Sequence, residues 1–357
     1  MQEQDKEAYS ERYCSEMTSV SKSIEQHDQQ QQATSTSSRG TPLASSGNLL
    51  TLGELTPPEF KSLIDLAEVF RAERRSKKFT HQIPGTSLAL LFEKPSTRTR
   101  VSFEVAMFEL GGHAVVLSTR DMQSSRGEPP EDTARALSRY CHGIAARVNS
   151  HETLVTFAKN ASIPVINALS DNYHPCQTIA DIQTIRQYKR KLKGLKLAWI
   201  GDGDNVCNSL LIGSALSGID VTVACPAGYA PLDEAMSLAK TQAENNGSQI
   251  DVVHDAAEAA TDADVIVTDT FISMGHDEER ERRLKVFIPD FQVNDRLMSF
   301  AKEDAIFMHC LPAHRGEEVS ASVIDGPQSV VWQEAENRLH GQKAVLYTLM
   351  KKYSAKL

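Results

Sequence analysis

Apolar and polar positions alternate along most of the chain in a way that predicts strands and helices in succession. Short continuous apolar runs are typical of buried strands, and longer runs with apolar residues three or four positions apart predict helices. In the first half, strands are predicted at 87–92, 114–118, 143–148 and 164–168, and helices at 58–75, 101–110, 132–140 and 174–188. In the second half, strands are predicted at 195–200, 221–224, 250–253, 265–267 and 305–308, and a final helix at 334–352.

This alternation indicates an α/β protein. Strands separated by helices build mostly parallel sheets that helices cover on both faces. A chain of 357 residues is long for one core, so we expect two doubly wound domains. The segment 189–194, which is rich in basic residues and ends in glycine, is the predicted boundary between the two domains. We therefore predict a first domain at 47–188, a second at 189–333, and a C-terminal helix at 334–357 that packs back on the first domain.

Residues 1–46 differ from the rest, because they hold a glutamine run and a Ser/Thr cluster and show almost no apolar periodicity. Disorder is predicted for this tail. It carries four Lys or Arg against seven acidic residues, whereas mitochondrial presequences are rich in Arg and poor in acids. The charge favours a cytoplasmic protein, with the mitochondrial matrix as the alternative, since atypical presequences exist.

The net charge of −9 argues against a general nucleic-acid binder, which usually carries a basic stripe. No apolar run reaches the roughly 18 residues that a transmembrane helix needs. The six cysteines form no C-x-x-C pair, so neither a disulfide framework nor a metal site is expected. No membrane partner, metal or cofactor is predicted.

The segment Ser96-Thr97-Arg98-Thr99-Arg100 lies between a predicted strand and a predicted helix. The first turn of a helix has unpaired N–H groups and the positive end of the macrodipole, which suits an anion. Arginine adds a fork that binds two phosphate oxygens at once. The simpler interpretation is a Ser/Thr cap followed by two solvated arginines, but the position of the segment favours a phosphate site.

Further polar clusters follow other predicted strands. Arg147 ends one strand, although a lone Arg there is more often a surface residue. His174 and Gln177 lie at the start of the helix opened by Pro175, where proline is well tolerated. An isolated His in this place is usually only a cap. Because the carboxyl ends of parallel strands meet at one edge, these side chains are expected to converge on a ligand.

Two clusters lie at strand ends in the second half. Asp269 and Ser273, four residues apart, have the chemistry to hold an ammonium group, although a simple Asp-Thr turn is the alternative. Cys310 follows His309 and is either a nucleophile or a polar contact, since no Cys–His–Asn arrangement is evident. The loop 201–205 invites a dinucleotide interpretation, yet Val206 replaces the third glycine of that fingerprint.

Taken in order, these clusters resemble the carbamoyltransferase superfamily, and within it the ornithine carbamoyltransferases. The resemblance covers residues 49–353. The segment 92–100 looks like the carbamoyl-phosphate loop, and residues 174–177 (His-Pro-Cys-Gln) and 309–312 (His-Cys-Leu-Pro) match the two other shared motifs. The Ser273-Met274-Gly275 turn looks like the ornithine loop, which differs in aspartate carbamoyltransferases.

The resemblance implies carbamoyl transfer from carbamoyl phosphate to the δ-amine of L-ornithine, without a cofactor, in a homotrimer. Arg98, Arg147, His174, Asp269 and Cys310 would be catalytic. The carbamoyl-phosphate site would comprise Ser96, Thr97, Arg98, Thr99, Gln123, Arg147, His174, Gln177, Cys310, Leu311 and Arg338, with Gln123 lent by a neighbouring subunit. The ornithine site would comprise Asn205, Asp269, Ser273 and Met274.

Two departures from the family pattern stand near this implied site. Asp204 occupies a position where most members have Asn, and Ser125 with the residues after it replaces a glycine-containing stretch. Three alternatives remain at this point: a carbamoyltransferase for putrescine or an acylated ornithine, a catalytically silent paralogue, and a nicotinamide-dependent oxidoreductase. The intact phosphate cluster disfavours the second, and Val206 disfavours the third.

Overall fold

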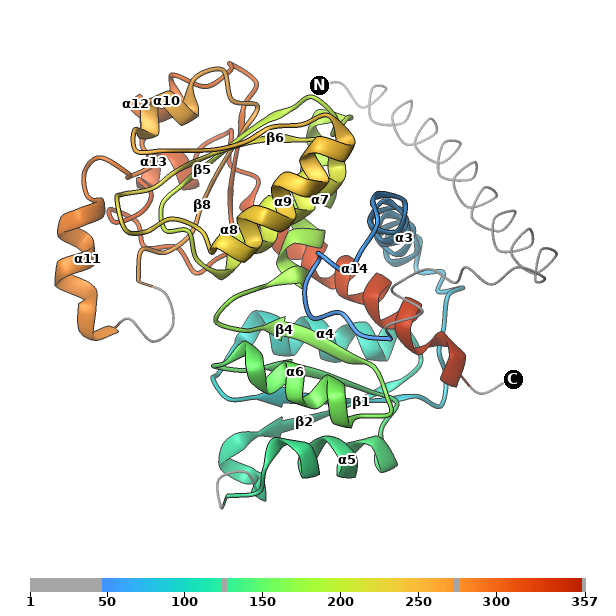
Figure 1. The fold of residues 1–357 in the computed structure, drawn as a ribbon. Coiled ribbons are helices and arrows are strands. Elements are labelled where there is room, and N and C mark those ends of the chain that lie inside the picture. Colours follow the sequence, from blue (N-terminus) through green and yellow to red (C-terminus); the bar gives the residue numbers. More distant parts are fainter. Residues whose placement is uncertain (1–46, 124–126, 273–276, 355–357) are drawn as a thin grey trace.

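The computed structural model describes residues 47–123, 127–272 and 277–354. The predicted disordered tail at 1–46 lies outside these residues. Two open sheets, one in each half of the chain, lie one above the other in Figure 1, with the long helix α14 running between them. Within the described ranges, no helix combines the length and apolar character needed to cross a membrane.

The first sheet has the strand order β2-β1-β3-β4, and every neighbouring pair is parallel. Because parallel neighbours need a crossover, a helix lies between successive strands. The elements of this half are α3 (Pro57–Ser76), β1 (Ser87–Phe92), α4 (Thr97–Glu109), β2 (His113–Ser118), η1 (Thr119–Asp121), α5 (Pro130–Tyr140), β3 (Gly143–Arg147), α6 (His151–Asn160), β4 (Val165–Leu169) and α7 (Pro175–Lys189).

The second sheet has the order β7-β6-β5-β8-β9 and is also entirely parallel. Its elements are β5 (Lys196–Ile200), α8 (Asn205–Ser217), β6 (Asp220–Ala224), α9 (Asp233–Asn246), β7 (Ile250–Val253), α10 (Ala256–Ala260), β8 (Val265–Thr268), η3 (Asp277–Glu279), α11 (Arg280–Phe287), α12 (Asp295–Met298), β9 (Ile306–His309) and α13 (Ala321–Ile324). The chain ends with α14 (Val331–Met350) and η4 (Lys351–Tyr353).

Alternate residues of the central strands enter different cores. In β1, Leu88 and Leu90 belong to one apolar cluster, whereas Ala89 and Leu91 belong to another on the opposite face. Both faces of this strand are therefore buried, as expected where helices cover a parallel sheet on both sides. The continuous apolar runs of the sequence reflect this double burial.

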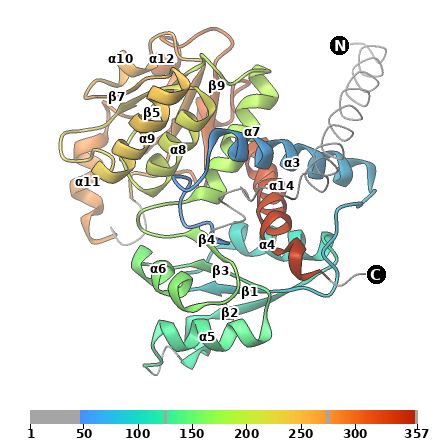
Figure 2. The same cartoon turned by 45° about the vertical axis from the view of Figure 1, so that its right-hand side comes forward.

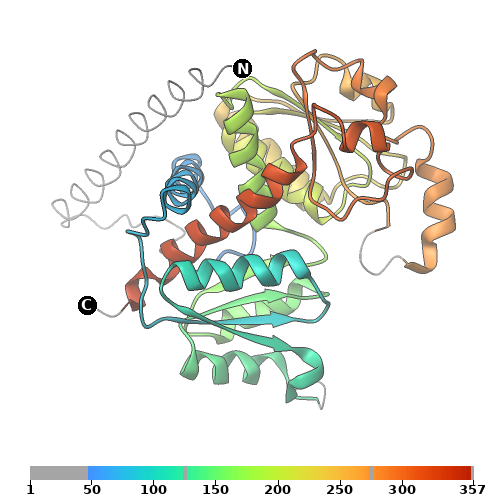
Figure 3. The ribbon, with the colours of Figure 1, turned by 180° about the vertical axis from the view of Figure 1, so that it is seen from behind.

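One of these cores is shared by the two halves. It joins side chains of β1 and α4 to side chains of β5 and α8, through α3, α7 and α14. Helix α14 packs on α3, α4 and α7, and the turned views show it reaching from the second sheet down to the first (Figures 2 and 3). The prediction that the C-terminal helix returns to the first half, in a two-sheet α/β fold, is confirmed.

The predicted element bounds need three corrections. Helix α4 begins at Thr97 rather than at Val101, because the Ser96 side chain caps it by accepting the backbone N–H of Thr99. Helix α14 begins at Val331, three residues earlier than predicted. Helix α6 (His151–Asn160) was not predicted, although its apolar residues Leu154, Phe157 and Ala158 recur at helical spacing. The predicted domain boundaries stay a prediction.

Candidate active site

A cavity of about 770 Å³ opens where the carboxyl ends of both sheets face each other. Its walls come from the segments that follow β1, β3, β4, β5, β8 and β9. Parallel sheets place ligands at this edge because the connecting loops gather there. The lining includes Ser96, Thr97, Arg98, Thr99, Arg147, His174, Gln177, Asn205, Asp269, Cys310, Leu311 and Arg338.

One wall of the cavity is the first turn of α4. Thr97, Arg98 and Thr99 supply its N-terminal N–H groups, and Ser96 caps it. No acidic residue stands in this turn, so nothing there offsets the positive end of the helix dipole. This wall is built to receive an anion.

Three guanidinium groups reach the same cavity from different elements. Arg98 comes from α4, Arg147 from the end of β3 and Arg338 from α14. Arg98 donates to the Leu311 carbonyl at 2.6 Å, and Arg338 donates to Gln177 at 2.6 Å and to Thr99 at 3.3 Å. These acceptors are neutral, so the positive charge of both groups is retained.

Arg147 lies in a crowd of cations. Burial, together with the nearby charges of Arg338 and Arg98, lowers the pKa of Arg147 to about 10. A bound dianion would offset this lowering, because a negative charge nearby favours the charged form of the guanidinium. The arrangement is therefore electrostatically incomplete without an anionic ligand.

His174 is the N-cap residue of α7, but its side chain does not cap the helix. The His174 backbone N–H is held by Ser209 at 2.7 Å, and the imidazole is buried in the cavity wall. Burial lowers the pKa of His174 well below its usual range, and the three arginines lower it further. The ring is therefore neutral at pH 7 and acts as a hydrogen-bonding group rather than as a cation.

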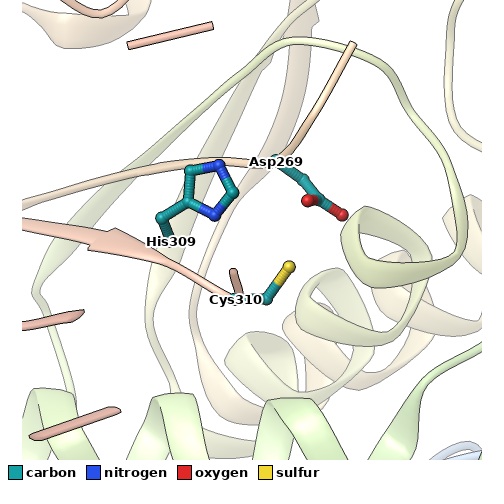
Figure 4. A group of neighbouring side chains, drawn as sticks. All are labelled: Asp269, His309 and Cys310. Atoms are coloured by element: carbon teal, nitrogen blue, oxygen red, sulfur yellow. The ribbon is translucent and has the colours of Figure 1, made fainter. Parts of the chain in front are cut away.

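On the side of the cavity formed by the second sheet, Asp269 follows β8 and Cys310 follows β9. Figure 4 shows the carboxylate and the thiol close to each other, with the ring of His309 to one side of them. Burial raises the pKa of the Cys310 thiol well above its usual range, and the adjacent Asp269 carboxylate raises it further. Cys310 is therefore a neutral S–H donor to Asp269, which agrees with a polar contact and not with a thiolate nucleophile.

A buried pair of side chains shapes the turn that carries Cys310. His309 Nε2 lies 3.1 Å from Glu318 Oε1, and His309 Nδ1 accepts the backbone N–H of Leu311 at 2.9 Å. Leu311 adopts a left-handed φ of 60° before the cis peptide bond to Pro312. This conformation points the Leu311 carbonyl at Arg98.

Asn205 begins α8 on the third side of the cavity. Its amide donates to the Ser170 carbonyl at 2.6 Å, which ties the loop after β5 to the loop after β4. Asp204, the N-cap residue of this helix, also lines the cavity. The carboxylate that departs from the family pattern therefore faces the site.

Two family models match most of the described part of the chain. The carbamoyl-P binding domain of aspartate/ornithine carbamoyltransferase matches residues 47–187, and the Asp/Orn binding domain matches residues 193–349. The chain belongs to the aspartate/ornithine carbamoyltransferase family. It is 50% identical over 304 residues to an ornithine carbamoyltransferase of Methanosarcina acetivorans, covering 85% of this chain and 99% of that one.

Other members of the family agree in sequence and in structure. An ornithine carbamoyltransferase of Pyrococcus furiosus described as anabolic is 50% identical over 303 residues, covering 85% of this chain and 96% of that protein. The solved structure of an ornithine carbamoyltransferase from the same organism superposes with a TM-score of 0.83 at 50% identity, covering 87% of this chain and 99% of that one. A mitochondrial ornithine carbamoyltransferase from Coccidioides immitis gives a TM-score of 0.78 at 37% identity, covering 85% and 98% of the two chains.

The carbamoyltransferase fold brings together most of the predicted site residues, with three exceptions. Gln123 lies on the exposed loop after η1 and is not part of the cavity wall within this chain. Ser273 and Met274, predicted for the ornithine loop, lie outside the described residues, as does Ser125. Their predicted roles stay predictions.

Sequence reasoning missed several residues that line or support the site. Asn149 and Asp171 line the cavity two residues after β3 and β4, respectively, so their positions after strands were a usable signal. Asp181 and Glu334 are buried beneath Gln177. They lie inside helical patterns, where nothing in the sequence separates a buried acid from a solvated one.

Two side-chain groups in the described ranges have the composition of a metal site: Asp269 with His309 and Cys310, and His314 with Glu317 and Glu318. In the first, both ring nitrogens of His309 are engaged, by Glu318 and by the Leu311 N–H. In the second, Glu318 already accepts the His314 backbone N–H and contacts His309.

Proposed function

We propose that this chain transfers the carbamoyl group of carbamoyl phosphate to the δ-amine of L-ornithine, giving L-citrulline and phosphate. The observation that carries the proposal is the convergence of three guanidiniums and a helix N-terminus on one wall of a cavity whose opposite wall holds Asp269 and Cys310. This supports a reaction between a small dianion and an amine. The family membership and the names of the relatives support the same choice.

In this proposal, Ser96, Thr97, Arg98, Thr99 and Arg147 bind the phosphate. The first turn of α4 supplies N–H donors, and Arg supplies paired donors in a fixed geometry. The neutral imidazole of His174 donates to the carbamoyl oxygen, together with Arg98 and Thr99. Donors that are held in place before the reaction stabilise the charge that develops on this oxygen.

The remaining contacts of carbamoyl phosphate are assigned to Gln177, Arg338, Cys310 and Leu311. Gln177 and Arg338 hold each other in the cavity wall. The Leu311 carbonyl is an acceptor that reaches the amino group of the carbamoyl moiety. Gln123 would come from a neighbouring subunit, which is part of the proposal that the protein is a homotrimer.

Ornithine is assigned to the opposite side, between Asn205 and Asp269, with Ser273 and Met274 completing its site. Its δ-amine must lose a proton before it attacks, because the pKa of a free amine is about 10. The attack forms the C–N bond and breaks the bond from the carbamoyl carbon to the phosphate oxygen. The ammonium gives its first proton to solvent before the attack, and the departing phosphate takes the second proton, which the nitrogen loses as the C–N bond forms, so the reaction balances without a cofactor.

We propose that Arg98, Arg147, His174, Asp269 and Cys310 are the catalytic residues. The two-domain division at 47–188 and 189–333, with helix 334–357 returning, belongs to the same proposal, since it places the two substrates on different domains. We place the activity in the cytoplasm, because the tail at 1–46 has more acidic than basic residues.

The experiment is citrulline formation from carbamoyl phosphate with ornithine, putrescine, N-acetylornithine or aspartate supplied separately. We expect turnover with ornithine and at most traces with the others. Equal or better turnover with putrescine or N-acetylornithine would show that this amine, and not ornithine, is the substrate. Binding of phosphate without turnover of any amine would favour a silent paralogue.

A further inference from the structure

Two carboxyl groups, Asp181 of α7 and Glu334 of α14, lie next to each other in the interior beneath the cavity. Each side chain is about 1% exposed. Asp181 stands one helical turn after Gln177, and Glu334 stands one turn before Arg338. The proposed reaction does not use either carboxyl, and two adjacent buried negative charges would be costly.

The hydrogen bonds around this pair are asymmetric. Gln177 Nε2 donates to Asp181 Oδ1 at 2.7 Å and to Glu334 Oε1 at 3.0 Å. The second oxygen of Glu334, Oε2, accepts the backbone N–H of His309 at 2.9 Å. Both oxygens of Glu334 are therefore acceptors of N–H groups.

Asp181 Oδ2 is different, because it is buried and receives no N–H or O–H donor from the described residues. The Gln177 amide donates to one oxygen of each acid, which holds the two carboxyls side by side in the interior, and two carboxylates in that position repel each other unless one carries a proton. Burial raises the pKa of both carboxyls, and Asp181 raises that of Glu334 further. The charged and titratable groups that face the pair are Arg338, which lies on the same helix as Glu334, Asp269 after β8 and Cys310 after β9.

We infer that Asp181 and Glu334 share one proton, carried on Asp181 Oδ2, and that the pair positions Gln177 and Arg338 at the anion site. The shared proton completes a set of four hydrogen bonds. Asp181 donates to Glu334, Glu334 and Asp181 accept from the Gln177 amide, and the Gln177 carbonyl accepts from Arg338 Nη1.

The shared proton matters for the site because it fixes the orientation of the Gln177 side-chain amide. Its N–H group faces the acids, so its carbonyl oxygen faces Arg338 and holds the guanidinium through a neutral acceptor. If both acids were charged, their attraction would pull Arg338 away from Thr99 and the cavity. Asp181 and Glu334 are thus positioning residues, and the pair also ties α14 to the strand end that carries Cys310, through His309.

The inference predicts that the two isosteric amide variants behave differently. In Asp181→Asn, the new amide N–H replaces the shared proton, and its carbonyl still accepts from Gln177, so every hydrogen bond is retained. Glu334 accepts the His309 backbone N–H with one oxygen and the Gln177 amide N–H with the other. Because the backbone N–H cannot turn, the new carbonyl of Glu334→Gln faces His309 and its NH₂ group faces Gln177. Two donors then oppose each other, and Gln177 must turn its carbonyl away from Arg338.

We expect the KM for carbamoyl phosphate to rise about tenfold or more in Glu334→Gln, and to stay within about threefold of wild type in Asp181→Asn, since a lost bond to a charged group has roughly that effect. The KM for ornithine should change little in either variant, which a general loss of structure would not produce. Glu109→Gln, a buried acid on α4 outside the cavity, is the control for stability. Equal effects of the two variants, or the reverse order, would overturn the inference.

The kinetic test rests on the proposed function, so a second readout is independent of it. The infrared difference spectrum of wild type minus Asp181→Asn at pH 6 should contain a protonated-carboxyl band, and that of wild type minus Glu109→Gln should not. Calorimetry with inorganic phosphate should show weaker binding only in Glu334→Gln. A wild type without any such band contradicts the shared proton, even if a variant does not fold. A wild type with the band but without turnover contradicts only the proposed function.

Discussion

Arg98 Nη2 donates a hydrogen bond of 2.6 Å to the carbonyl oxygen of Leu311, which lies 213 residues further along the chain. Arg98 belongs to the first turn of α4 beside the first sheet, and Leu311 follows β9 of the second sheet. This single contact joins the anion-binding wall of the cavity to the turn that carries Cys310. The two halves of the active site are therefore in direct contact.

Arg98→Ala should lower kcat/KM for carbamoyl phosphate by two orders of magnitude or more. The side chain supplies a donor for the phosphate and for the developing oxyanion, and one such donor is worth about 3 kcal/mol in the transition state. Steady-state citrulline formation measures the effect. Arg100→Ala is the matched control, because Arg100 is in the same motif but exposed and outside the cavity wall. Near-normal activity of Arg98→Ala would remove Arg98 from the mechanism.

Cys310 should react slowly with iodoacetamide at pH 8. Burial and Asp269 raise the pKa of its thiol, and only the thiolate is alkylated. Asp269→Asn removes a negative charge from beside the sulfur, so the pKa should fall and the alkylation rate should rise about threefold or more. Peptide mass spectrometry follows the modification. Asp255→Asn, at the exposed start of α10, should leave the rate unchanged; a fast wild-type reaction would contradict the assignment of a neutral thiol.

Titration of His174 should make the protein less stable in mild acid. Because burial holds the pKa of His174 well below its usual range, the unfolded chain binds a proton below pH 6.5 while the folded chain does not. The free energy of unfolding should therefore fall as the pH drops from 7 to 5, by up to about 2 kcal/mol from this residue. Urea unfolding of wild type and His174→Asn at both pH values tests this. The variant should lose less stability; an equal loss would show that His174 is not responsible.

Lys343→Met should destabilise the fold without changing the substrate KM values. The Lys343 ammonium is fully buried, donates to Glu109 at 2.9 Å and lies 4.7 Å from the centroid of the Phe70 ring. Methionine keeps the packing but removes the charge, while Glu109 remains paired with Arg74. The remaining pair limits the expected loss to about 1–3 kcal/mol. Thermal unfolding and steady-state kinetics measure the two effects. A loss of activity without a loss of stability would contradict the prediction.

Gly203→Ala should weaken ornithine binding and stability together. A Cβ at this position would lie 2.2 Å from the backbone nitrogen of Pro231, and backbone atoms cannot move aside cheaply. The loop that carries Asn205 must therefore shift. We expect a rise in the KM for ornithine and a loss of about 2 kcal/mol in stability. A change in the KM for carbamoyl phosphate alone would contradict the assignment of this loop to ornithine.

Local patterns predicted much of the architecture because each strand is buried on both faces. The apolar run at 87–92 matches β1, and its neighbours in the sheet were predicted in the same way. The helix α6 was not predicted, although its apolar residues recur at helical spacing. The start of α4 was misplaced because Thr97 and Arg98 carry no apolar signal, and the cap that starts the helix is a single Ser96 hydroxyl.

The motifs in the sequence determined which side chains meet at the cavity, since strand-end residues of parallel sheets converge whatever the details of packing. Only the tertiary structure decided their charge states. His174 is neutral because the surrounding protein buries it and three arginines lie nearby, and Cys310 keeps its proton because it is buried and Asp269 lies beside it. The shared proton that we infer for Asp181 and Glu334 depends on two helices, α7 and α14, that are more than a hundred residues apart in the chain. Desolvation and charge proximity are properties of the folded environment, so no local pattern encodes them.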